Sequence, residues 1–279
     1  MKKYLVNQKE SGQTLEKYVK KVLSNAPLSF IYKLFRKKDI RVNGHWQKEK
    51  YVINENDEVT IIKSGVFAND YNLVNISFPN CITIEEVAFF GAEELKNADF
   101  LNCASIKDQA FQYCSSLSSI NFPNCSYIGN YAFYDCINLI SINLLNCSYI
   151  ATYAFYNCTN LTTINIPNCS YIGSSAFYSC INLTTIDIPN CSYIGSYAFK
   201  YCSRLSSIYL LTFTRPSLQN SNVFSYTPLT DSSYLSDKYG SIYVRQSLLT
   251  SFKTGLYWSY FSSRFVGLTD EEITNLNFN

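Results

Sequence analysis

The sequence predicts an α/β protein in which a solenoid of stacked coils with a parallel sheet follows a small α+β domain. Two observations lead to this prediction. From Tyr71 to Cys202 the chain repeats a 22-residue pattern six times, and a seventh copy begins at Ser203 and then fades. Residues 1–63 do not repeat, and they carry 14 Lys and Arg against 7 Asp and Glu, whereas residues 64–279 carry 9 against 14. A basic unit joined to a slightly acidic body indicates an anionic partner for the N-terminal part.

The N-terminal unit is predicted to contain two helices followed by strands. Apolar residues recur at helical spacing within residues 11–23, and Pro27 begins a second amphipathic helix. The buried face of that second helix is expected to consist of Phe30, Ile31, Leu34 and Phe35. The segment "IRVNGHW" then predicts a strand and a hairpin turn at Asn43-Gly44, and "YVINENDEVTII" predicts a turn and a closing strand.

Three apolar columns define the repeat. They begin at Leu73, Ile76 and Phe78 and recur every 22 residues, for example at Leu161, Ile164 and Ile166. The spacing L-x-x-I-x-I-x-x-C is typical of a leucine-rich repeat, in which Cys or Asn ends the strand. The segment A-F-y-x-C that follows places Ala, Phe and Cys inward at helical-turn spacing. One such coil cannot bury its apolar face alone, so the repetition indicates burial between neighbouring coils.

The eleven cysteines are expected to be small buried side chains. From Cys103 onward they recur every 11 residues, which places them in two stacked columns, one after the strand and one after the turn. A zinc site would need ligands two to four residues apart, and the spacing offers none. Stacked neighbours would fall within disulfide range, but the odd number of cysteines argues against a disulfide framework. Thiols that fill a narrow column are the preferred interpretation.

Several asparagines precede these cysteines and match the N-glycosylation pattern, as in four copies of Asn-Cys-Ser and one of Asn-Cys-Thr. We interpret this Asn instead as a residue that pairs with the backbone at the end of each strand.

The outward strand positions are predicted to form a binding face for a protein or a glycan. The residues assigned to this face are Ser119, Asn121, Ser141, Asn143, Thr163, Asn165, Thr185 and Asp187. They are small, polar and nearly uncharged, and the face is expected to lack the aromatic anchors that dominate hot spots. A solvated sheet is the alternative. Rows of tyrosine, among them Tyr127, Tyr149 and Tyr171, are placed on the opposite side and in the turns, where they suit either a contact surface or shielding of the turns.

The repeat carries a more specific resemblance. The run I-P-N-C-S-Y-I-G-S-Y-A-F-Y-x-C, followed by x-x-L, resembles the leucine-rich repeats of bacterial BspA-type surface proteins. Residues 241–244, 248–252 and 258–261 resemble the C-terminal cap of that family. The resemblance covers about 200 residues and implies the fold. Members of the family are often secreted adhesins.

The N-terminal unit is similar to the small RNA-binding module of ribosomal small-subunit protein four, in the version that precedes large-subunit pseudouridine synthases. The similarity rests on "SGQTLEKYVKKVL", "APLSFIYKLFRKKDIRVNG" and "YVINENDEVTI", in that order. It implies that the second helix and the next strand face structured RNA. The RNA-binding residues it implies are Ser29, Lys33, Arg36, Lys37, Lys38, Arg41 and Asn43. No H-R-L-D-type catalytic segment follows, so synthase activity is not implied.

We expect neither catalysis nor a cofactor. The single histidine, His45, follows a hairpin turn and has no Cys or Ser partner nearby in sequence, so it is expected to be an exposed loop residue. The phosphate-loop, dinucleotide-binding and zinc-protease motifs are absent. No apolar run reaches the length of about 18 residues that a membrane span needs. Residues 1–13 have no apolar segment typical of a signal peptide, so a cytoplasmic location is expected, with a phage particle or non-classical export as alternatives.

The sequence therefore predicts a small basic domain in residues 1–63, a linker in 64–70, a leucine-rich-repeat solenoid in 71–210 and a C-terminal cap in 211–279. The leading hypothesis is a non-catalytic scaffold for protein–protein contacts with an RNA-binding head. The alternative is a structural or adhesive component of a larger assembly, such as a phage particle or a cell-surface adhesin, whose head serves assembly or caps the solenoid. A modifying enzyme recruited through its head is a third hypothesis.

Overall fold

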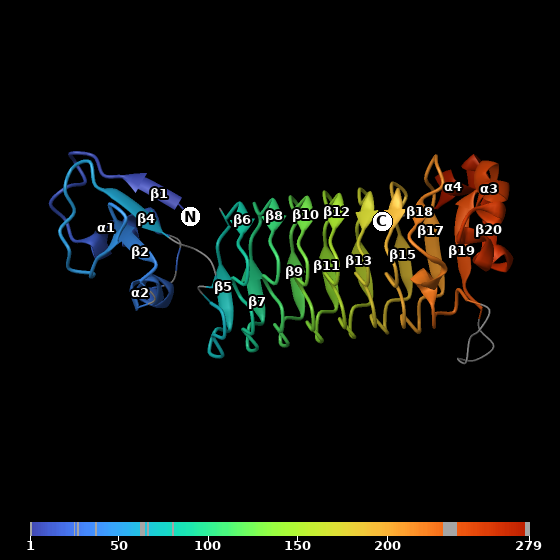
Figure 1. Ribbon diagram of the computed structural model, residues 1–279, viewed down its shortest axis with the longest axis horizontal. Helices are drawn as coiled ribbons and strands as arrows, with labels where there is room; N and C mark the ends of the chain where they lie inside the picture. Colours follow the sequence, from blue (N-terminus) through green and yellow to red (C-terminus); the bar gives the residue numbers. More distant parts are fainter. Residues whose placement is uncertain are drawn as a thin grey trace.

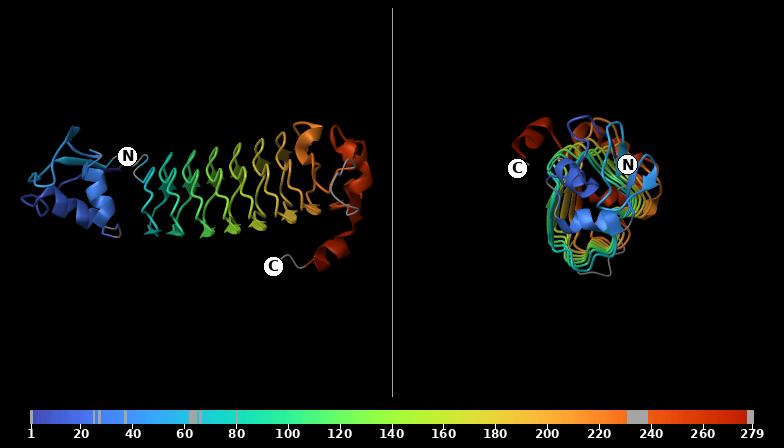
Figure 2. Two further views of the ribbon diagram at one scale, coloured as in Figure 1. Left: turned by 90° about the horizontal axis from the view of Figure 1, so that it is seen from below. Right: turned by 90° about the vertical axis from the view of Figure 1, so that its left-hand side faces the viewer.

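The chain forms an elongated molecule with a small head at one end and a helical cap at the other (Figure 1). The computed structural model describes residues 2–24, 26, 28–36, 38–61, 65, 67–79, 81–230 and 239–276. Between the two ends, short strands stack coil upon coil along the long axis, and an end-on view shows the coils superimposed (Figure 2). This is the leucine-rich-repeat solenoid that the repeat predicts.

The head is an antiparallel sheet with two helices. The sheet has the order β1-β4-β2-β3. Its elements are β1 (Lys2–Leu5), α1 (Leu15–Val22), α2 (Leu28–Arg36), β2 (Ile40–Val42), β3 (His45–Trp46) and β4 (Glu58–Ile61). The Thr14 hydroxyl accepts a hydrogen bond from the Lys17 amide and caps α1. The hairpin turn is found at Asn43 and Gly44, which both have positive φ, as the sequence predicts. Strand β1 is an element that the sequence pattern did not predict.

The predicted inward face of α2 is confirmed. The side chains of Phe30, Ile31, Leu34 and Phe35 are all buried.

Each coil of the solenoid contributes two short strands rather than the single strand that the repeat indicated. The first series consists of β5 (Asn75–Ser77), β7 (Asn97–Asp99), β9 (Ser119–Asn121), β11 (Ser141–Asn143), β13 (Thr163–Asn165), β15 (Thr185–Asp187) and β17 (Ser207–Leu210). The second consists of β6 (Thr83–Ile84), β8 (Ser105–Ile106), β10 (Tyr127–Ile128), β12 (Tyr149–Ile150), β14 (Tyr171–Ile172), β16 (Tyr193–Ile194) and β18 (Ser217–Leu218). Both series pair in parallel, so the solenoid has two sheets along its length.

The strand pairing follows the sequence period. Ser141 pairs with Ser119 and Thr163, one coil away on each side. The second ladder is continuous from β6 to β18, whereas the first is divided into β5–β13 and a second group of β15, β17, β19 and β20. Strand β18 pairs with β16, so the seventh coil extends past Leu210 into the segment expected to form the cap.

The core of the solenoid consists of the predicted apolar columns. The central strand residues Ile120, Ile142 and Ile186 are buried, whereas Ser119 and Asn121 on either side of Ile120 are exposed. A ladder of phenylalanine rings runs beside them, with centroids 5.0–5.6 Å apart from Phe89 to Phe224. Its members from coil to coil are Phe89, Phe111, Phe133, Phe155, Phe177, Phe199 and Phe224.

The A-F-y-x-C segments are turns and not helical turns, which corrects the expected local conformation. Tyr131 and Asp135 both have φ of 56°, and they flank Ala132 and Phe133. Two left-handed residues four positions apart bend the chain while Ala132, Phe133 and Cys136 still point inward. The inward positions of Ala, Phe and Cys are therefore confirmed.

The asparagine before each strand-end cysteine bonds to the backbone, as expected. The Nδ2 atoms of Asn124, Asn146, Asn168 and Asn190 donate to carbonyl oxygens of the preceding coil at 2.7–3.0 Å. Each amide therefore ties one coil to the next at the point where the strand ends.

The C-terminal cap continues the first sheet and closes the apolar column. It contains η1 (Ser221–Phe224), β19 (Ser241–Arg245), η2 (Gln246–Leu248), α3 (Leu249–Thr254), η3 (Trp258–Arg264), β20 (Phe265–Leu268) and α4 (Asp270–Asn275). Phe224 at the end of the phenylalanine ladder contacts Trp258 and Phe261, both of which are buried. The Trp258 indole N–H donates to the Pro216 carbonyl at 2.7 Å, so its polar atom is satisfied.

The head covers the first coil through α2. The Phe30 ring stacks on Phe67 with centroids 4.7 Å apart, and Phe67 stacks on Phe89 at 5.1 Å. Lys33 Nζ forms an ion pair with Asp70 at 2.7 Å. The phenylalanine ladder thus begins in the head, which protects the apolar end of the solenoid as a capping unit must.

Candidate functional site

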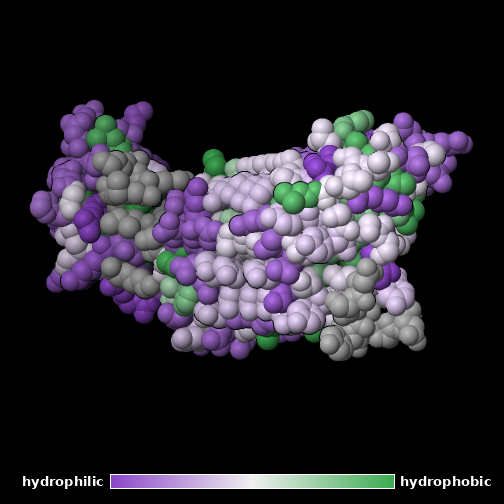
Figure 3. Space-filling view, turned by 45° about the vertical axis from the view of Figure 1, so that its right-hand side comes forward, coloured by the Kyte–Doolittle hydropathy of each residue, from purple (hydrophilic) through white to green (hydrophobic). Residues whose placement is uncertain are grey.

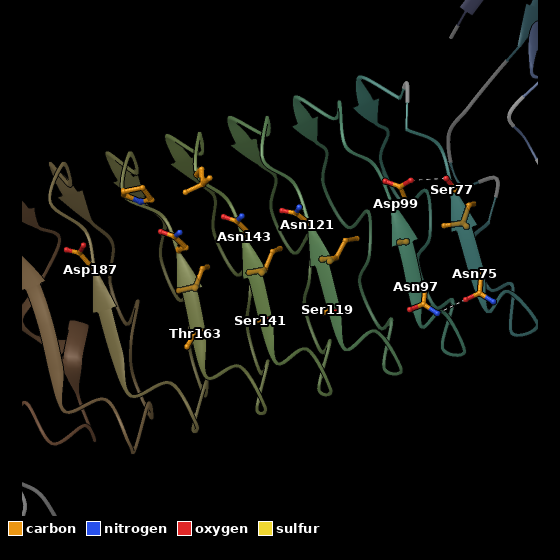
Figure 4. Close-up of a pocket in the computed structure, with 18 of the residues that line it drawn as sticks. Asn75, Ser77, Asn97, Asp99, Ser119, Asn121, Ser141, Asn143, Thr163 and Asp187 are labelled. Carbon is orange, nitrogen blue, oxygen red and sulfur yellow. Dashed lines mark hydrogen bonds between the residues drawn. The ribbon is translucent and has the colours of Figure 1, made fainter. Parts of the chain in front are cut away.

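Two rows of polar side chains cover the outer face of the first sheet, which we call the strand face. Each first-series strand contributes the residues on either side of its buried central residue. One row reads Asn75, Asn97, Ser119, Ser141, Thr163 and Thr185, and the other reads Ser77, Asp99, Asn121, Asn143, Asn165 and Asp187. All eight residues that the sequence assigned to a binding face lie on it. Figure 4 shows Asp99, Asn121, Asn143 and Asp187 in one row, and Ser119, Ser141 and Thr163 in the next.

An open groove of about 1370 Å³ lies over the strand face, between β5 and β15. Its floor consists of the two polar rows with the buried Ile side chains between them, and Leu145 and Pro167 also line it. Asp99 and Asp187 are the charged residues among those that line it. On the side of the molecule that Figure 3 shows, the solenoid surface is mostly weakly polar, whereas the head is more strongly hydrophilic. A partner on this face would meet hydroxyls, amides and two carboxylates.

The N-terminal end of the strand face is satisfied internally. The Asn97 side-chain amide donates to Asn75 Oδ1 at 2.7 Å, and the Ser77 hydroxyl donates to Asp99 Oδ2 at 3.0 Å. These bonds are drawn in Figure 4. They hold four side chains of the first two coils in fixed positions.

Two polar atoms farther along the strand face lack partners in the described part of the chain, one near its middle on β11 and one at its C-terminal end on β15. Asn143 Oδ1 and Asp187 Oδ1 are buried and have no hydrogen-bond donor among the described residues. Burial raises the pKa of the Asp187 carboxyl to about 6, because a desolvated carboxylate is disfavoured without a compensating donor. Asp187 also lies where the first ladder is divided, between β13 and β15.

An aromatic pair extends the strand face beyond Asp187, which corrects the expectation that the face lacks aromatic anchors. Tyr209 is in register with Asp187 on the neighbouring strand, and Tyr243 of β19 is in register with Tyr209. The two rings stack with centroids 4.5 Å apart. Tyr243 was missed because it comes 34 residues after Tyr209 instead of 22. The signal was the matching pair "SIYL" at 207–210 and "SIYV" at 241–244.

The cysteine columns are part of the core. Ten of the eleven thiols are buried, and Cys81 is half-buried, which confirms that they are small core residues. Cys136, Cys158 and Cys180 donate from Sγ to a carbonyl oxygen 25 residues earlier at 3.1–3.2 Å. Burial raises the pKa of the Cys147 and Cys191 thiols to about 12. A thiol that stays protonated at neutral pH is a poor nucleophile and a poor metal ligand.

Tyrosines form ladders on the second sheet and in the turns. Tyr149 and Tyr171 stack with centroids 4.3 Å apart, and Tyr156 stacks on Tyr178 at 4.7 Å. These rings are half-buried against one another. Half-buried stacked rings suit both roles that the sequence allows, a contact surface and shielding of the turns, and both stay predictions.

The predicted RNA-binding residues of the head divide into two groups. Arg36, Lys38 and Arg41 are exposed, and Lys38 Nζ lies 5.1 Å from the centre of the Trp46 ring. Arg41 is paired in register with Trp46 across β2 and β3. These cations and the tryptophan are open to a partner.

The second group is occupied within the chain or lies outside the described part of it. Lys33 Nζ bonds to Asp70 and lies over the Phe67 ring at 5.3 Å, so it faces the solenoid. The Asn43 side chain donates to Asp57 and accepts from the Glu58 amide, so it holds its turn. The side chain of Ser29 and the whole of Lys37 lie outside the described residues.

His45 is exposed, as expected, although it belongs to β3 and not to a loop. Within the described part of the chain, no three His, Cys, Asp or Glu side chains are grouped so that they could hold a metal ion. None of the helices among these residues is both long and apolar enough to cross a membrane.

The two stacked parallel ladders, the apolar columns and the open polar strand face define a leucine-rich-repeat protein. A family model for the BspA type leucine rich repeat region matches residues 47–147 and 126–243, with six copies of the repeat. The chain belongs to this family of BspA-type leucine-rich repeat proteins.

Individual relatives cover the chain in parts. A curated protein of Mycoplasma capricolum subsp. capricolum, described as an uncharacterized RNA pseudouridine synthase, is 33% identical over 78 residues. This match covers 27% of the chain, and the chain spans about a quarter of that relative, 26% of its length. The match supports the resemblance of the N-terminal module, although it extends no further into the synthase.

Among solved structures, a leucine-rich repeat protein from Bacteroides ovatus is 15% identical, with 82% of this chain and 98% of that chain covered and a TM-score of 0.32. An internalin from Listeria monocytogenes is 10% identical, with 86% and 59% covered and a TM-score of 0.39. A leucine-rich repeat protein from T. pallidum is 22% identical, with 44% and 72% covered and a TM-score of 0.35.

Proposed function

We propose that the chain is a non-catalytic protein-interaction scaffold that holds a partner polypeptide on its strand face. The observation that supports this proposal is the open groove over that face, lined by small polar side chains on rigid strands. Side chains held by a repetitive backbone present donors and acceptors in fixed positions, which reduces the entropy that binding must overcome.

The groove has the length of a short peptide segment. It crosses the strands from β5 to β15, and five intervals of about 4.8 Å give about 24 Å. An extended segment of about seven residues has this length at about 3.3 Å per residue. The small side chains of the two polar rows let such a segment approach the sheet closely.

The test is selection from a phage-displayed library of random peptides on the immobilised full chain. Selected peptides should bind the chain at least tenfold more weakly when Asn121→Arg and Asn165→Arg are introduced together, because both side chains are exposed on the strand face. Ser126→Arg with Ser170→Arg, two exposed positions that do not line the groove, is the matched control and should leave binding unchanged. Equal losses in both variants would show that the peptides bind elsewhere.

We also propose that the head binds structured RNA through Arg36, Lys38, Arg41 and Trp46. The exposed cations and the Lys38–Trp46 contact favour it, since basic side chains bind phosphates and an aromatic ring can stack on an unpaired base. The similarity to a pseudouridine synthase over 78 residues is consistent with this role.

The RNA test measures binding of a labelled transfer-RNA pool to the full chain by fluorescence anisotropy at low salt. Arg36→Glu with Arg41→Glu should abolish binding, whereas Lys96→Glu with Lys253→Glu, which changes the charge equally on exposed sites of the solenoid and cap, should largely preserve it. Lys33 is left unchanged because it is paired with Asp70. Absence of binding by the unmodified chain, or equal losses in both variants, would refute an RNA-binding head.

A further inference from the structure

A carboxylate and two stacked aromatic rings lie side by side at the C-terminal end of the strand face. Asp187, Tyr209 and Tyr243 occupy equivalent positions on the consecutive strands β15, β17 and β19. The tyrosine rings are stacked at 4.5 Å. All three side chains are half-buried, so each keeps an accessible part. Figure 4 shows Asp187 at the end of the groove, in the row that begins with Ser77 and Asp99.

The two carboxylates of the groove are in different states. Asp99 accepts a hydrogen bond from Ser77. Asp187 Oδ1 is buried with no donor among the described residues, and no ion pair involving Asp187 is formed by them. An unpaired, partly desolvated carboxylate is costly for the fold. Such a group gains more from an added cation than a solvated carboxylate does, because it has already lost part of its water.

The charge of the groove favours a partner with a positively charged group. Asp99 and Asp187 are acidic, and no Lys or Arg is among the described residues that line the groove. The neighbouring rings also favour a cation, since the face of a tyrosine ring attracts an ammonium or guanidinium group. The Asp187 carboxylate and the two tyrosine rings therefore both favour a cationic group, and they do so at adjacent positions.

We propose that this end of the strand face holds a Lys or Arg side chain of an extended partner polypeptide, with its charged group bonded to Asp187 and its methylene stem against Tyr209 and Tyr243. The inference rests on the proposed scaffold function and specifies which side chain of the partner the scaffold recognises. The cation would bond to the accessible part of the half-buried Asp187 carboxylate, in a charge-assisted hydrogen bond, and would balance the charge that the buried Oδ1 atom leaves without a donor among the described residues. The apolar stem of Lys or Arg would cover the rings, as long basic side chains do on apolar surfaces.

A metal ion and a neutral sugar fit this site less well. Among the described residues no three potential metal ligands are grouped, so Asp187 does not belong to a set of that size. A sugar hydroxyl could donate to Asp187 and stack on the tyrosines, but it would leave the carboxylate charge unbalanced in a partly desolvated position. The polypeptide cation satisfies both the hydrogen bond and the charge.

The experiment uses the same random peptide library on the full chain and on two variants, Asp187→Asn and Asp99→Asn. Peptides selected on the unmodified chain should be enriched in Lys or Arg at one position. Their binding should fall at least tenfold with Asp187→Asn and much less with Asp99→Asn. Asp99→Asn is the matched control, because it removes one carboxylate charge from the opposite end of the same groove.

A second measurement separates a direct contact from a structural effect. One selected peptide is made with its Arg replaced by citrulline, which keeps the shape and removes the charge, or with its Lys replaced by norleucine. Binding is then measured for both peptides on both chains. A direct ion pair predicts non-additive losses: the peptide change should have little further effect once Asp187→Asn is present.

The outcomes are distinguishable. Peptides that bind in the groove without a basic preference, and bind the Asp187→Asn variant equally well, would overturn this inference and leave the scaffold function intact. Strictly additive losses in the two-by-two measurement would overturn it as well. If no peptide binds and an oligosaccharide array shows binding that Asp187→Asn abolishes, both the inference and the peptide scaffold are wrong. Failure to select any peptide or sugar counts against both.

Discussion

At the scale of single residues, the strand face includes a few side chains that lower the stability of the fold. Most polar groups there are either solvated or bonded within the face, as Asn75 and Asn97 are. Asp187 is different, since it is partly desolvated and lacks a donor among the described residues. Residues that a fold places at a cost are more often explained by binding than by stability.

The cost of Asp187 predicts a pH-dependent gain of stability when its charge is removed. The folded-state pKa is raised to about 6, above the unfolded value of about 3.9. The carboxyl therefore favours the folded state below about pH 4, and this contribution is lost as the pH rises through about 6. Asp187→Asn should raise the free energy of unfolding by about 1 kcal/mol at neutral pH, a value reduced for the solvent that reaches the side chain.

Urea unfolding of both chains at about pH 4 and about pH 7.5 tests this prediction. The difference between the variant and the unmodified chain should be small at the lower pH and should favour the variant at the higher one. A variant that is less stable at both values would show that the Asp187 carboxylate stabilises the fold.

At the scale of elements, each coil stacks a buried phenylalanine ring on the rings of its neighbours. Phe155 is fully buried and contacts Phe133 at 5.1 Å and Phe177 at 5.3 Å. The next residue, Tyr156, belongs to a parallel ladder but is only half-buried. The two ladders therefore differ in burial although they have similar geometry.

This difference predicts unequal effects of truncation. Phe155→Ala should lower the free energy of unfolding by about 3–5 kcal/mol, because it removes a buried ring and leaves a cavity that two neighbouring coils share. Tyr156→Ala is the matched control and should cost about 1 kcal/mol, since it loses mainly stacking. Chemical unfolding monitored by circular dichroism gives both values. Equal losses would mean that the half-buried tyrosine ladder carries as much stability as the core.

The elements that the sequence predicted are those with a strong local period. Leu161, Ile164 and Cys169 recur with their counterparts every 22 residues, so their burial could be inferred from the period alone. The second strand of each coil, such as β14 (Tyr171–Ile172), is too short for alternation to reveal it. Tyr243 could not be placed on the strand face in this way, because an insertion before it interrupts the 22-residue period. The pairing of Lys33 with Asp70 could not be inferred either, because a basic helix face can meet either RNA or an acidic neighbour.

At the scale of the whole molecule, the thiols couple stability to alkaline pH. Nine buried cysteines have a raised pKa, with burial the main cause in all but Cys103, where a bond to Cys125 contributes most. They are Cys103, Cys114, Cys136, Cys147, Cys158, Cys169, Cys180, Cys191 and Cys202. An unfolded chain would lose protons from these thiols near about pH 8.5.

The expected result is steep unfolding at alkaline pH. The thiols stay protonated in the fold, so the stability that they contribute is complete below about pH 8.5 and falls by about 1.4 kcal/mol per pH unit for each thiol above it. Raised tyrosine pKa values, such as that of Tyr149 at about 12, act in the same direction at higher pH. Circular dichroism during an alkaline titration should show one cooperative loss of structure, and a thiol reagent should label the cysteines only as that loss occurs. Labelling of a natively folded chain would contradict the prediction.

The ring ladder that begins at Phe30 and ends at Phe224 passes through every coil and meets the same kind of neighbour at each step. Each coil contacts mainly the coils before and after it. Recombination between neighbouring repeats of the gene could therefore remove or duplicate one coil, and the coils on either side of the change could still stack on each other. Descendants of this gene can therefore differ in length while keeping the same terminal domains, and the strand face would lengthen or shorten by one strand at a time.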